Sequence, residues 1–192
     1  MSFPYSLLED PEELATYGGW SEEVYRDFLA LQRGEMTQDD FDTRYATRKA
    51  VLILDLTGFT VTASNSGALH SFLRIFDAQK VCLPVLQDTG ANFVRTFADD
   101  LVALFDEPGQ ALDAALELHH RIALFNRSDR VGPYPTDCCV GIGYGTVYRI
   151  GPDCAMGDEM NRASKLGEDT ARGGETLLTE RTWAALPALS RS

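Results

Sequence analysis

The sequence has no run of 18 or more apolar residues and no signal-like start, the features of a membrane span or a secreted precursor. We therefore expect a soluble, cytoplasmic protein with no membrane partner. Basic residues are also scarce, because 17 Lys and Arg stand against 29 Asp and Glu, a formal charge of −12 at pH 7. Such a charge repels nucleic acid and anionic membrane surfaces. A nucleic acid partner is not expected either.

Paired cysteines are missing as well. The sequence has no C-x-x-C spacing of the kind that builds zinc sites. We expect reduced thiols at the four cysteines, Cys82, Cys138, Cys139 and Cys154. Internal repeats and low-complexity tracts are absent too, and 192 residues that are 44% hydrophobic suffice for one well-packed core.

The segment AVLILDLTGFT, residues 50–60, carries the first chemical signal. Its first five residues are all apolar, which indicates a strand covered on both faces. Asp55 follows at the strand end, and Gly58 allows a tight turn. Thr57 and Thr60 can cap a helix whose free N–H groups attract an anion. Since Mg²⁺ binds one or two carboxylates together with substrate phosphates, the segment predicts a metal and phosphate site. An ordinary strand followed by a turn is the alternative.

The segment RTFADDLVALF, residues 95–105, carries the second signal. Two β-prone stretches flank Ala98-Asp99-Asp100, which predicts a tight hairpin with acids at its tip. If the hairpin pairs with the first strand, Asp99 lies beside Asp55. The alternative is that Asp99 and Asp100 are ordinary turn residues, and Asp100 can be only that.

With these two segments the chain resembles the catalytic domain of the class III nucleotide cyclases, the adenylate and guanylate cyclase family. DLTGFT is similar to the first metal motif of that family, and RTFADDLVALF to its second-metal hairpin. VGIGYGTV, residues 140–147, and AMGDEMNRASKL, residues 155–166, resemble a strand and a helix of the family. The four motifs occur in the family's order and cover roughly residues 48–180.

The resemblance implies an α+β fold, a ferredoxin-like βαββαβ cyclase fold with an N-terminal helical extension. The predicted order of strand, helix, hairpin, helix and strand fits that fold. We expect the catalytic domain to span residues 48–192, after an arm and helices in residues 1–47. Within the extension, Ser21 and Thr37 have the sequence context of helix starts, and Gly34 that of a helix stop.

Two amphipathic helices are predicted between the strands. The first spans residues 61–83, and Pro84 closes or kinks its end. Its inward face is expected to consist of four apolar residues, Leu69, Phe72, Leu73 and Phe76. The second helix spans residues 109–126. His119 and His120 lack a partner acid at ligand spacing, so we expect them to be solvated or to lie at the edge of the core.

The resemblance also implies a two-metal mechanism. Asp55 and Asp99 would hold two divalent cations, Mg²⁺ or Mn²⁺, with the Leu56 carbonyl as a further ligand. Substrate would contact the loop residues Thr57, Gly58, Phe59 and Thr60. Asn161 would orient the ribose, and Lys165, four residues on and therefore on the same helix face, would stabilise charge on the α-phosphate. Relatives usually have Arg there, and Lys keeps the charge but loses the planar fork. A solvated helix face is the alternative.

Two further positions select the base in the family, and here they are Arg95 and Cys154. Neither the adenylate pair (Lys with Asp or Thr) nor the guanylate pair (Glu with Cys) is present. Arginine has donors only, which suits the carbonyl acceptors of uracil and guanine. Without Glu, the donors of guanine would stay unpaired at a cost of about 1 to 3 kcal/mol. We favour UTP, with ATP next.

The altered pair also resembles the stand-alone pyrimidine cyclases of bacterial anti-phage signalling, which implies cyclic UMP as a second messenger.

Active sites in the family are shared between two protomers, so the resemblance implies a head-to-tail homodimer that binds a nucleoside triphosphate. Three departures from the family's usual residues leave a second class of function open. They are Lys165, Thr146 where some relatives have Arg, and a shortened C-terminal hairpin that often supplies a triphosphate-binding Lys. A chain with these departures could instead be an inactive cyclase-like module for nucleotide binding or dimerisation.

Overall fold

The computed structural model describes residues 4–57, 68–129, 135–151 and 154–187. They belong to two compact units. The first comprises Met1–Thr47 and Val147–Met156, and the second comprises 48–146 and 157–192. Within the described ranges, no helix combines the length and the apolar character needed to cross a bilayer.

The first unit is built from short, capped helices and the end of a strand pair. Its elements are α1 (Pro11–Gly18), α2 (Glu22–Arg33), α3 (Gln38–Tyr45) and the short strand β5 (Ala155–Met156). The Ser21 side chain accepts the Val24 N–H, and Thr37 forms a capping box with Asp40. Gly34 ends α2 with a φ of 70°, a conformation that glycine adopts without strain. The predicted helix starts and stop are confirmed.

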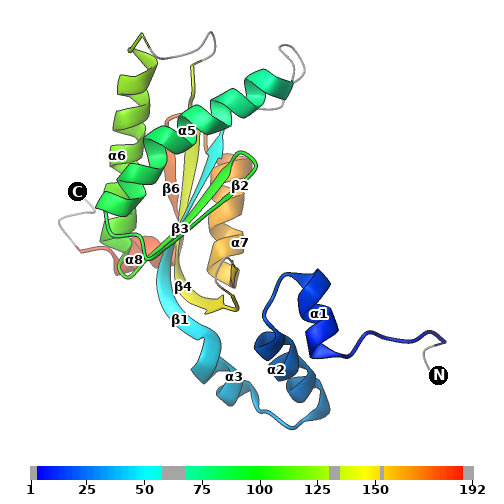
Figure 1. The fold of residues 1–192 in the computed structure, drawn as a ribbon. Helices are drawn as coiled ribbons and strands as arrows, with labels where there is room; N and C mark the ends of the chain where they lie inside the picture. Colours follow the sequence, from blue (N-terminus) through cyan, green and yellow to red (C-terminus); the bar gives the residue numbers. More distant parts are fainter. Residues whose placement is uncertain (1–3, 58–67, 130–134, 152–153, 188–192) are drawn as a thin grey trace. The chain divides into compact units, whose positions relative to one another are not determined.

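The second unit carries most of a six-stranded sheet in the order β2-β3-β1-β4-β5, with β6 paired to β4. Its elements are β1 (Ala46–Leu56), α5 (Ala68–Asp88), β2 (Phe93–Phe97), β3 (Asp100–Phe105), α6 (Pro108–Asn126), β4 (Cys138–Arg149), α7 (Asp158–Ser164), the π-helix η1 (Lys165–Thr170), β6 (Thr176–Leu178) and α8 (Glu180–Ala185). β3 pairs antiparallel with both β1 and β2. This is the predicted α+β, ferredoxin-like arrangement (Figure 1).

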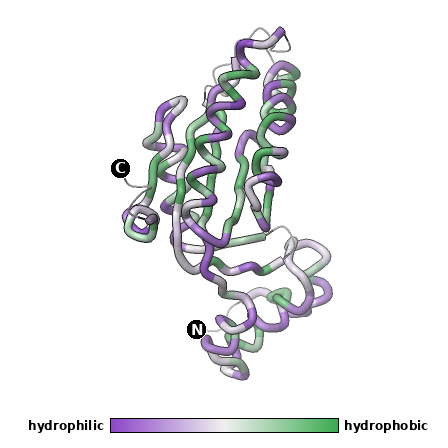
Figure 2. The backbone as a smooth tube through the Cα atoms, turned by 90° about the vertical axis from the view of Figure 1, so that its left-hand side faces the viewer, coloured by the Kyte–Doolittle hydropathy of each residue, from purple (hydrophilic) through white to green (hydrophobic). Residues whose placement is uncertain are grey.

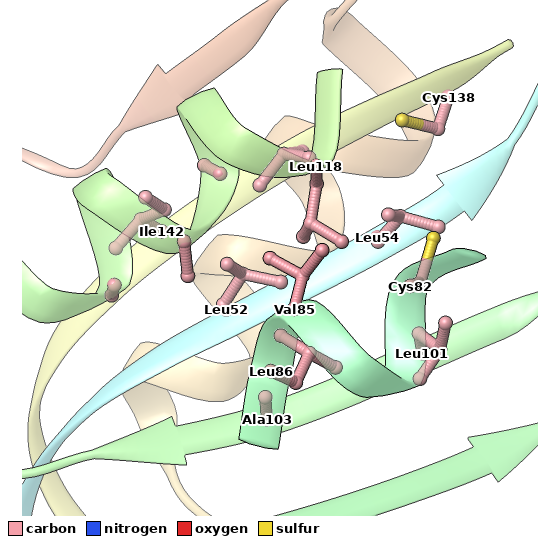
Figure 3. Packing of buried hydrophobic residues seen from close by; sticks show 14 of the residues in the cluster. Leu52, Leu54, Cys82, Val85, Leu86, Leu101, Ala103, Leu118, Cys138 and Ile142 are labelled. Carbon is pink, nitrogen blue, oxygen red and sulfur yellow. The ribbon is translucent and has the colours of Figure 1, made fainter. Parts of the chain in front are cut away.

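The core of the second unit lies between the sheet and the two long helices, α5 and α6. Figure 3 shows Leu52 and Leu54 of β1 packed with Val85 of α5 and Leu118 of α6, and all four side chains are fully buried. Hydrophobic and hydrophilic positions alternate along the long helices (Figure 2), as expected when one face packs on a sheet. Residues 50–54 of β1 are all buried, which confirms the prediction of a strand covered on both faces.

The other face of the sheet meets α7 through alternate glycines of β4. Gly141, Gly143 and Gly145 point to the same side of the strand. A Cβ atom on Gly141 would lie 1.9 Å from the Ala163 carbonyl oxygen, and one on Gly143 would lie 2.5 Å from that of Glu159. The glycines therefore let the backbone of α7 pack directly on the strand.

The prediction for α5 is wrong about which face points inward, and of the two alternatives for Pro84, closing the helix is excluded. The helix continues through Pro84 to Asp88, and the face expected to point inward is exposed at Leu69, Phe72, Leu73 and Phe76. The buried face carries both polar and apolar side chains, namely Ser71, Arg74, Ala78, Cys82, Val85 and Leu86. Periodicity locates an apolar stripe but does not tell a core-facing stripe from one that faces outward. The predicted second helix, residues 109–126, is confirmed as α6.

Candidate metal and nucleotide site

Three carboxylates meet where β1 and β3 pair. Leu54 lies opposite Leu101 in the β1–β3 register, so the next residues along, Asp55 and Asp100, are neighbours across the two strands. Asp99 occupies the adjoining turn. One carboxylate oxygen from each of the three aspartates lies within 4.8 Å of the others. Within the described ranges, no other three His, Cys, Asp or Glu side chains come as close to one another.

The turn that presents Asp99 is a two-residue hairpin loop. Phe97 pairs with Asp100, which leaves Ala98 and Asp99 between the strands. Ala98 has a φ of 51°, in the left-handed region where a Cβ atom is crowded against the backbone. Such strain is concentrated at functional sites, where surrounding structure maintains it. In this turn Asp99 lies beside Asp55 and Asp100.

Mutual repulsion and burial favour the protonated forms of two of these acids. Burial, followed by the charges of Asp100, Asp99 and Glu168, raises the pKa of Asp55 to about 6. Burial, followed by Glu168 and Asp99, raises the pKa of Asp100 to about 6. Glu168 comes from η1, where Gly167 packs against the backbone of β1 and β4. Cation binding requires the ionised carboxylates and therefore competes with protons near neutral pH.

The donor set of the cluster fits a hard divalent cation. Carboxylate oxygens are the ligands that Mg²⁺ and Mn²⁺ prefer, and a bound cation would relieve the repulsion among them. Asp55 and Asp99 were predicted as ligands, whereas Asp100 was weighed only as a turn residue. The signal that identifies Asp100 is the strand register, because the residue opposite Asp55 on β3 must lie beside it. Leu56, predicted to contribute its carbonyl, is the buried last residue of β1.

The loop after β1 is anchored by its first residue. The Thr57 N–H donates to the Asp137 carbonyl over 3.0 Å, so this amide is not directed at a ligand. The Thr57 carbonyl accepts from Nη2 of Arg74, also over 3.0 Å, and Arg74 is buried on α5. Asp137, just before β4, and Arg74 of α5 thus hold the chain just beyond Asp55. The predicted substrate contacts Gly58, Phe59 and Thr60 lie outside the described residues.

Asn161 and Lys165 lie one turn apart and are both exposed. Asn161 belongs to α7, and Lys165 begins η1. The Lys165 N–H donates to the carbonyls of Asn161 and Arg162, so the two side chains emerge on neighbouring parts of one helical surface, as predicted. π-Helical turns are rare and often occur at functional sites.

The two predicted base-selecting residues belong to different units. Arg95 is exposed on β2 of the second unit, and its guanidinium carbon lies 5.9 Å from the centre of the Phe97 ring. Cys154 belongs to the first unit, where it packs beside the cluster of Val24, Phe41 and Ile150. A pairing of these residues on one base stays a prediction.

The cysteines and histidines fill the structural roles expected of them. All four cysteines are free thiols, and burial raises the pKa of Cys82 to about 12. Nε2 of His119 lies 2.9 Å from Oγ1 of Thr176, and burial lowers the pKa of this imidazole. His120 is exposed. His119 is the predicted core-edge residue, and none of these side chains joins the acid cluster.

Comparison with known proteins gives structural neighbours only. No model of a known protein family matches the chain, and no curated protein does. The adenylyl cyclase CyaB from P. aeruginosa is 18% identical, with a TM-score of 0.62 over 73% of this chain and 81% of that one. The guanylate cyclase domain of RhGC from Catenaria anguillulae, in complex with GTP, is 19% identical, with a TM-score of 0.62 over 75% and 83% of the two chains.

A third neighbour is the "non-canonical dimeric" guanylyl cyclase domain of the RhoGC fusion protein from the fungus Blastocladiella emersonii. It is 20% identical, with a TM-score of 0.61 over 73% of this chain and 84% of that one. At this level of identity the likeness establishes the fold. The chain has the α+β fold of nucleotide cyclase catalytic domains.

Proposed function

We propose that this protein is a nucleotide cyclase, which converts a nucleoside triphosphate to a 3′,5′-cyclic monophosphate and pyrophosphate. The observation that carries the proposal is the cluster of Asp55, Asp99 and Asp100 at adjoining strand ends, in a chain with a cyclase fold. Residues 48–192 would form the catalytic domain, and residues 1–47 an N-terminal extension.

The acid cluster would hold two divalent cations, Mg²⁺ or Mn²⁺, with the Leu56 carbonyl as a further ligand. When bound, such cations favour ionisation of the ribose 3′-hydroxyl and neutralise the departing pyrophosphate. The contribution of the chain is positioning. The strand pair fixes Asp55 beside Asp100, the strained turn fixes Asp99, and Arg74 with Asp137 fixes the backbone beyond them at Thr57.

Asn161 and Lys165 would contact the nucleotide itself. The Asn161 amide can hydrogen-bond the ribose, and the Lys165 ammonium can stabilise negative charge on the α-phosphate. A lysine offers a point charge in place of the planar guanidinium fork. Thr57, Gly58, Phe59 and Thr60 would form the loop next to the phosphates, with Thr57 contributing its side chain because its amide is already bonded to Asp137.

The exposed stripe of α5 supports a homodimer. Leu69, Phe72, Leu73 and Phe76 follow the i, i+3, i+4, i+7 spacing of one helix face, and each is more than half exposed. An apolar stripe of this kind marks a docking surface. The proposed occupant is a second copy of this chain, as in the dimeric form of one structural neighbour, a domain that is also described as monomeric in another structure. Asn161 and Lys165 of one copy would then meet the acid cluster of the other.

UTP is the favoured substrate, which would make cyclic UMP the product, with a second-messenger role in bacterial anti-phage defence. Arg95 projects into solvent from β2 and presents donors without an acceptor. Those donors suit the carbonyl oxygens of uracil, which has one N–H donor of its own left to satisfy. Cys154 would complete the base contacts.

A substrate screen tests the proposal. The purified chain is incubated separately with UTP, ATP, GTP and CTP in the presence of Mn²⁺ or Mg²⁺, and cyclic nucleotide and pyrophosphate are measured by mass spectrometry and a coupled assay. We expect equimolar cyclic UMP and pyrophosphate, formed only with a divalent cation. If none of the four triphosphates gives a cyclic product at high enzyme concentration, the chain is a binding or dimerisation module instead.

A further inference from the structure

An apolar pocket of about 320 Å³ lies within the first unit, between α2, α3 and the β4–β5 hairpin. We call it the α3 pocket. Its lining residues come from the two helices and the hairpin, and they are Phe28, Leu31, Gln38, Phe41, Asp42, Tyr148, Ile150 and Met156. A pocket of this size, with an apolar lining and a few polar groups, is typical of a small-molecule site.

Three aromatic rings follow one another along the lining. The Phe41 ring is centred 5.0 Å from the ring of Phe28 and 6.1 Å from the ring of Tyr148, at interplanar angles of 40° and 37°. Phe41 is buried, and the other two residues are half-buried. Aromatic contacts of this kind stabilise one another, so the apolar surface is formed before any ligand binds. The face of an aromatic ring also attracts cations.

One carboxylate lies beside these rings. Asp42 is the only charged side chain among the described residues that line the pocket, and it is half-buried. Its Oδ1 accepts a hydrogen bond from the Tyr148 hydroxyl over 2.8 Å, which holds the carboxylate next to the aromatic surface. A charge flanked by apolar groups attracts an opposite charge more strongly than a fully solvated one does.

The basic residues close to Asp42 and Tyr148 in the sequence have other contacts. Nη1 of Arg44 lies 2.9 Å and 2.7 Å from the two carboxylate oxygens of Asp27. Arg149 lines a separate pocket, together with Glu23. Asp42 itself forms no ion pair with a described residue. The α3 pocket therefore combines apolar surface with one uncompensated negative charge, which is complementary to an apolar molecule that carries a positive charge.

We propose that the α3 pocket binds a small organic cation in which an ammonium group is attached to an apolar or aromatic body. The body would lie against Phe28 and Phe41, and the ammonium group would donate to Asp42. Tyr148 is the residue that positions this carboxylate. The lining belongs to the first unit and the acid cluster to the second, so binding requires neither metal nor cyclase activity.

The test compares 2-phenylethylamine with 2-phenylethanol, which has the same ring and chain length but no charge. Isothermal titration calorimetry measures the binding of each compound to the full chain at neutral pH, without nucleotide or metal. We expect wild-type protein to bind the amine roughly tenfold more tightly than the alcohol, since the amine adds a charge-assisted hydrogen bond. Asp42→Asn should bind the amine as weakly as it binds the alcohol.

Asp39→Asn is the matched control, because Asp39 is an exposed acid of the same helix that does not line the pocket. It changes the formal charge of −12 as much as Asp42→Asn does, and it should bind the amine like wild type. A general attraction of the amine to an acidic protein would instead affect both variants equally.

Two further variants test the assigned geometry. Tyr148→Phe keeps the ring and loses the hydrogen bond to Asp42, so its preference for the amine should fall between those of wild type and Asp42→Asn. Met156→Trp places a larger side chain at a lining position that is 52% exposed, and it should weaken binding of both compounds by filling the pocket. Circular dichroism confirms that each variant is folded, and these two variants decide the question if Asp42→Asn is not.

The proposal is overturned if wild-type protein binds neither compound at millimolar concentrations, or if Asp42→Asn and Asp39→Asn bind the amine equally well. Equal affinity of wild type for the amine and the alcohol also overturns it, because the pocket would then be an apolar surface without a preference for charge. Loss of the amine preference in Asp42→Asn alone supports the proposal, whatever the outcome of the cyclase assays.

Discussion

Asp55 and Asp100 lie next to each other across the β1–β3 pair, and the pKa of each is raised to about 6. The fold therefore brings together carboxylates that repel one another in the absence of a cation. Sites built for binding often reduce stability in this way. The cost should be measurable in the metal-free protein.

Replacing one member of the pair should stabilise the metal-free chain. Asp100→Asn removes a half-buried charge and its repulsion of Asp55. We therefore expect the melting temperature in EDTA at pH 7.5 to rise, on the order of a few degrees after screening by solvent. Because the folded-state pKa is raised, the contribution of Asp100 to stability is fully present below pH 4 and is lost as pH rises through about 6. The advantage of Asn should therefore disappear at low pH.

Differential scanning calorimetry at pH 7.5 and at pH 4.5 provides the measurement. Asp113→Asn is the control, because Asp113 is exposed on α6 and should shift neither melting temperature. If the Asp100→Asn variant is less stable than wild type at pH 7.5 in EDTA, the Asp100 carboxylate stabilises the metal-free chain. That result would contradict the predicted repulsion.

Because α7 packs directly on β4, we expect one methyl group added at Gly141 to lower the stability of the fold. Gly141→Ala places a Cβ atom 1.9 Å from the Ala163 carbonyl oxygen. The Cβ atom is bonded to the backbone and the oxygen is part of it, so a change of side-chain rotamer cannot relieve the clash. We expect a loss of roughly 1 to 3 kcal/mol in the free energy of unfolding. Gly109→Ala on α6 meets nothing within 4 Å, so it should be neutral or stabilise by about 0.4 to 1 kcal/mol. Urea denaturation compares the two, and equal effects would refute the close packing.

Much of this architecture could be predicted from the sequence. The apolar run before Asp55 gave a buried strand, and the turn residues around Asp99 gave the hairpin, because both signals are local. Asp100 was missed as a member of the cluster because its place depends on register between strands far apart in the sequence. The alternate glycines in β4 allow another backbone to approach the strand closely. The sequence does not say which element does so, and the structure identifies it as α7.

The prediction for the inward face of α5 was wrong for a different reason. Leu69, Phe72, Leu73 and Phe76 are more hydrophobic than the buried Ser71 and Arg74 on the opposite face, so periodicity selected the wrong side. Near the start of the helix, the buried Arg74 donates to the loop carbonyls of Thr57 and Pro135. Burial of this stripe would require a second chain, which is the homodimer proposed above.

If that stripe is the dimer contact, a charge within it should separate the copies. We expect Phe72→Glu to convert a dimer to a monomer in size-exclusion chromatography with light scattering, with little change in melting temperature because Phe72 is exposed. Cyclase activity should fall with dimerisation. Leu116→Glu is the control, because Leu116 of α6 is also more than half exposed, and it should stay dimeric. A Phe72→Glu protein that is still dimeric would place the contact elsewhere.

Arg95 tests the substrate preference. We expect Arg95→Ala to lower kcat/KM for UTP roughly ten- to a hundredfold more than for ATP, since a charge-assisted hydrogen bond to the base is worth about 1.5 to 3 kcal/mol. Arg95→Lys should do less harm because it retains a donor. Steady-state kinetics with both nucleotides measure the ratio. A parallel fall for both would mean that Arg95 serves the phosphates or the fold.

The most direct test of the central claim compares product formation by wild type and Asp99→Asn. Asp99 lies in a turn and is only partly buried, so its replacement by the isosteric Asn should leave the fold intact while removing one carboxylate of the cluster. With UTP and Mn²⁺, mass spectrometry should detect cyclic UMP and an equal amount of pyrophosphate from wild type, and neither above background from Asp99→Asn. Equal cyclic nucleotide formation by the two proteins would contradict catalysis at the acid cluster.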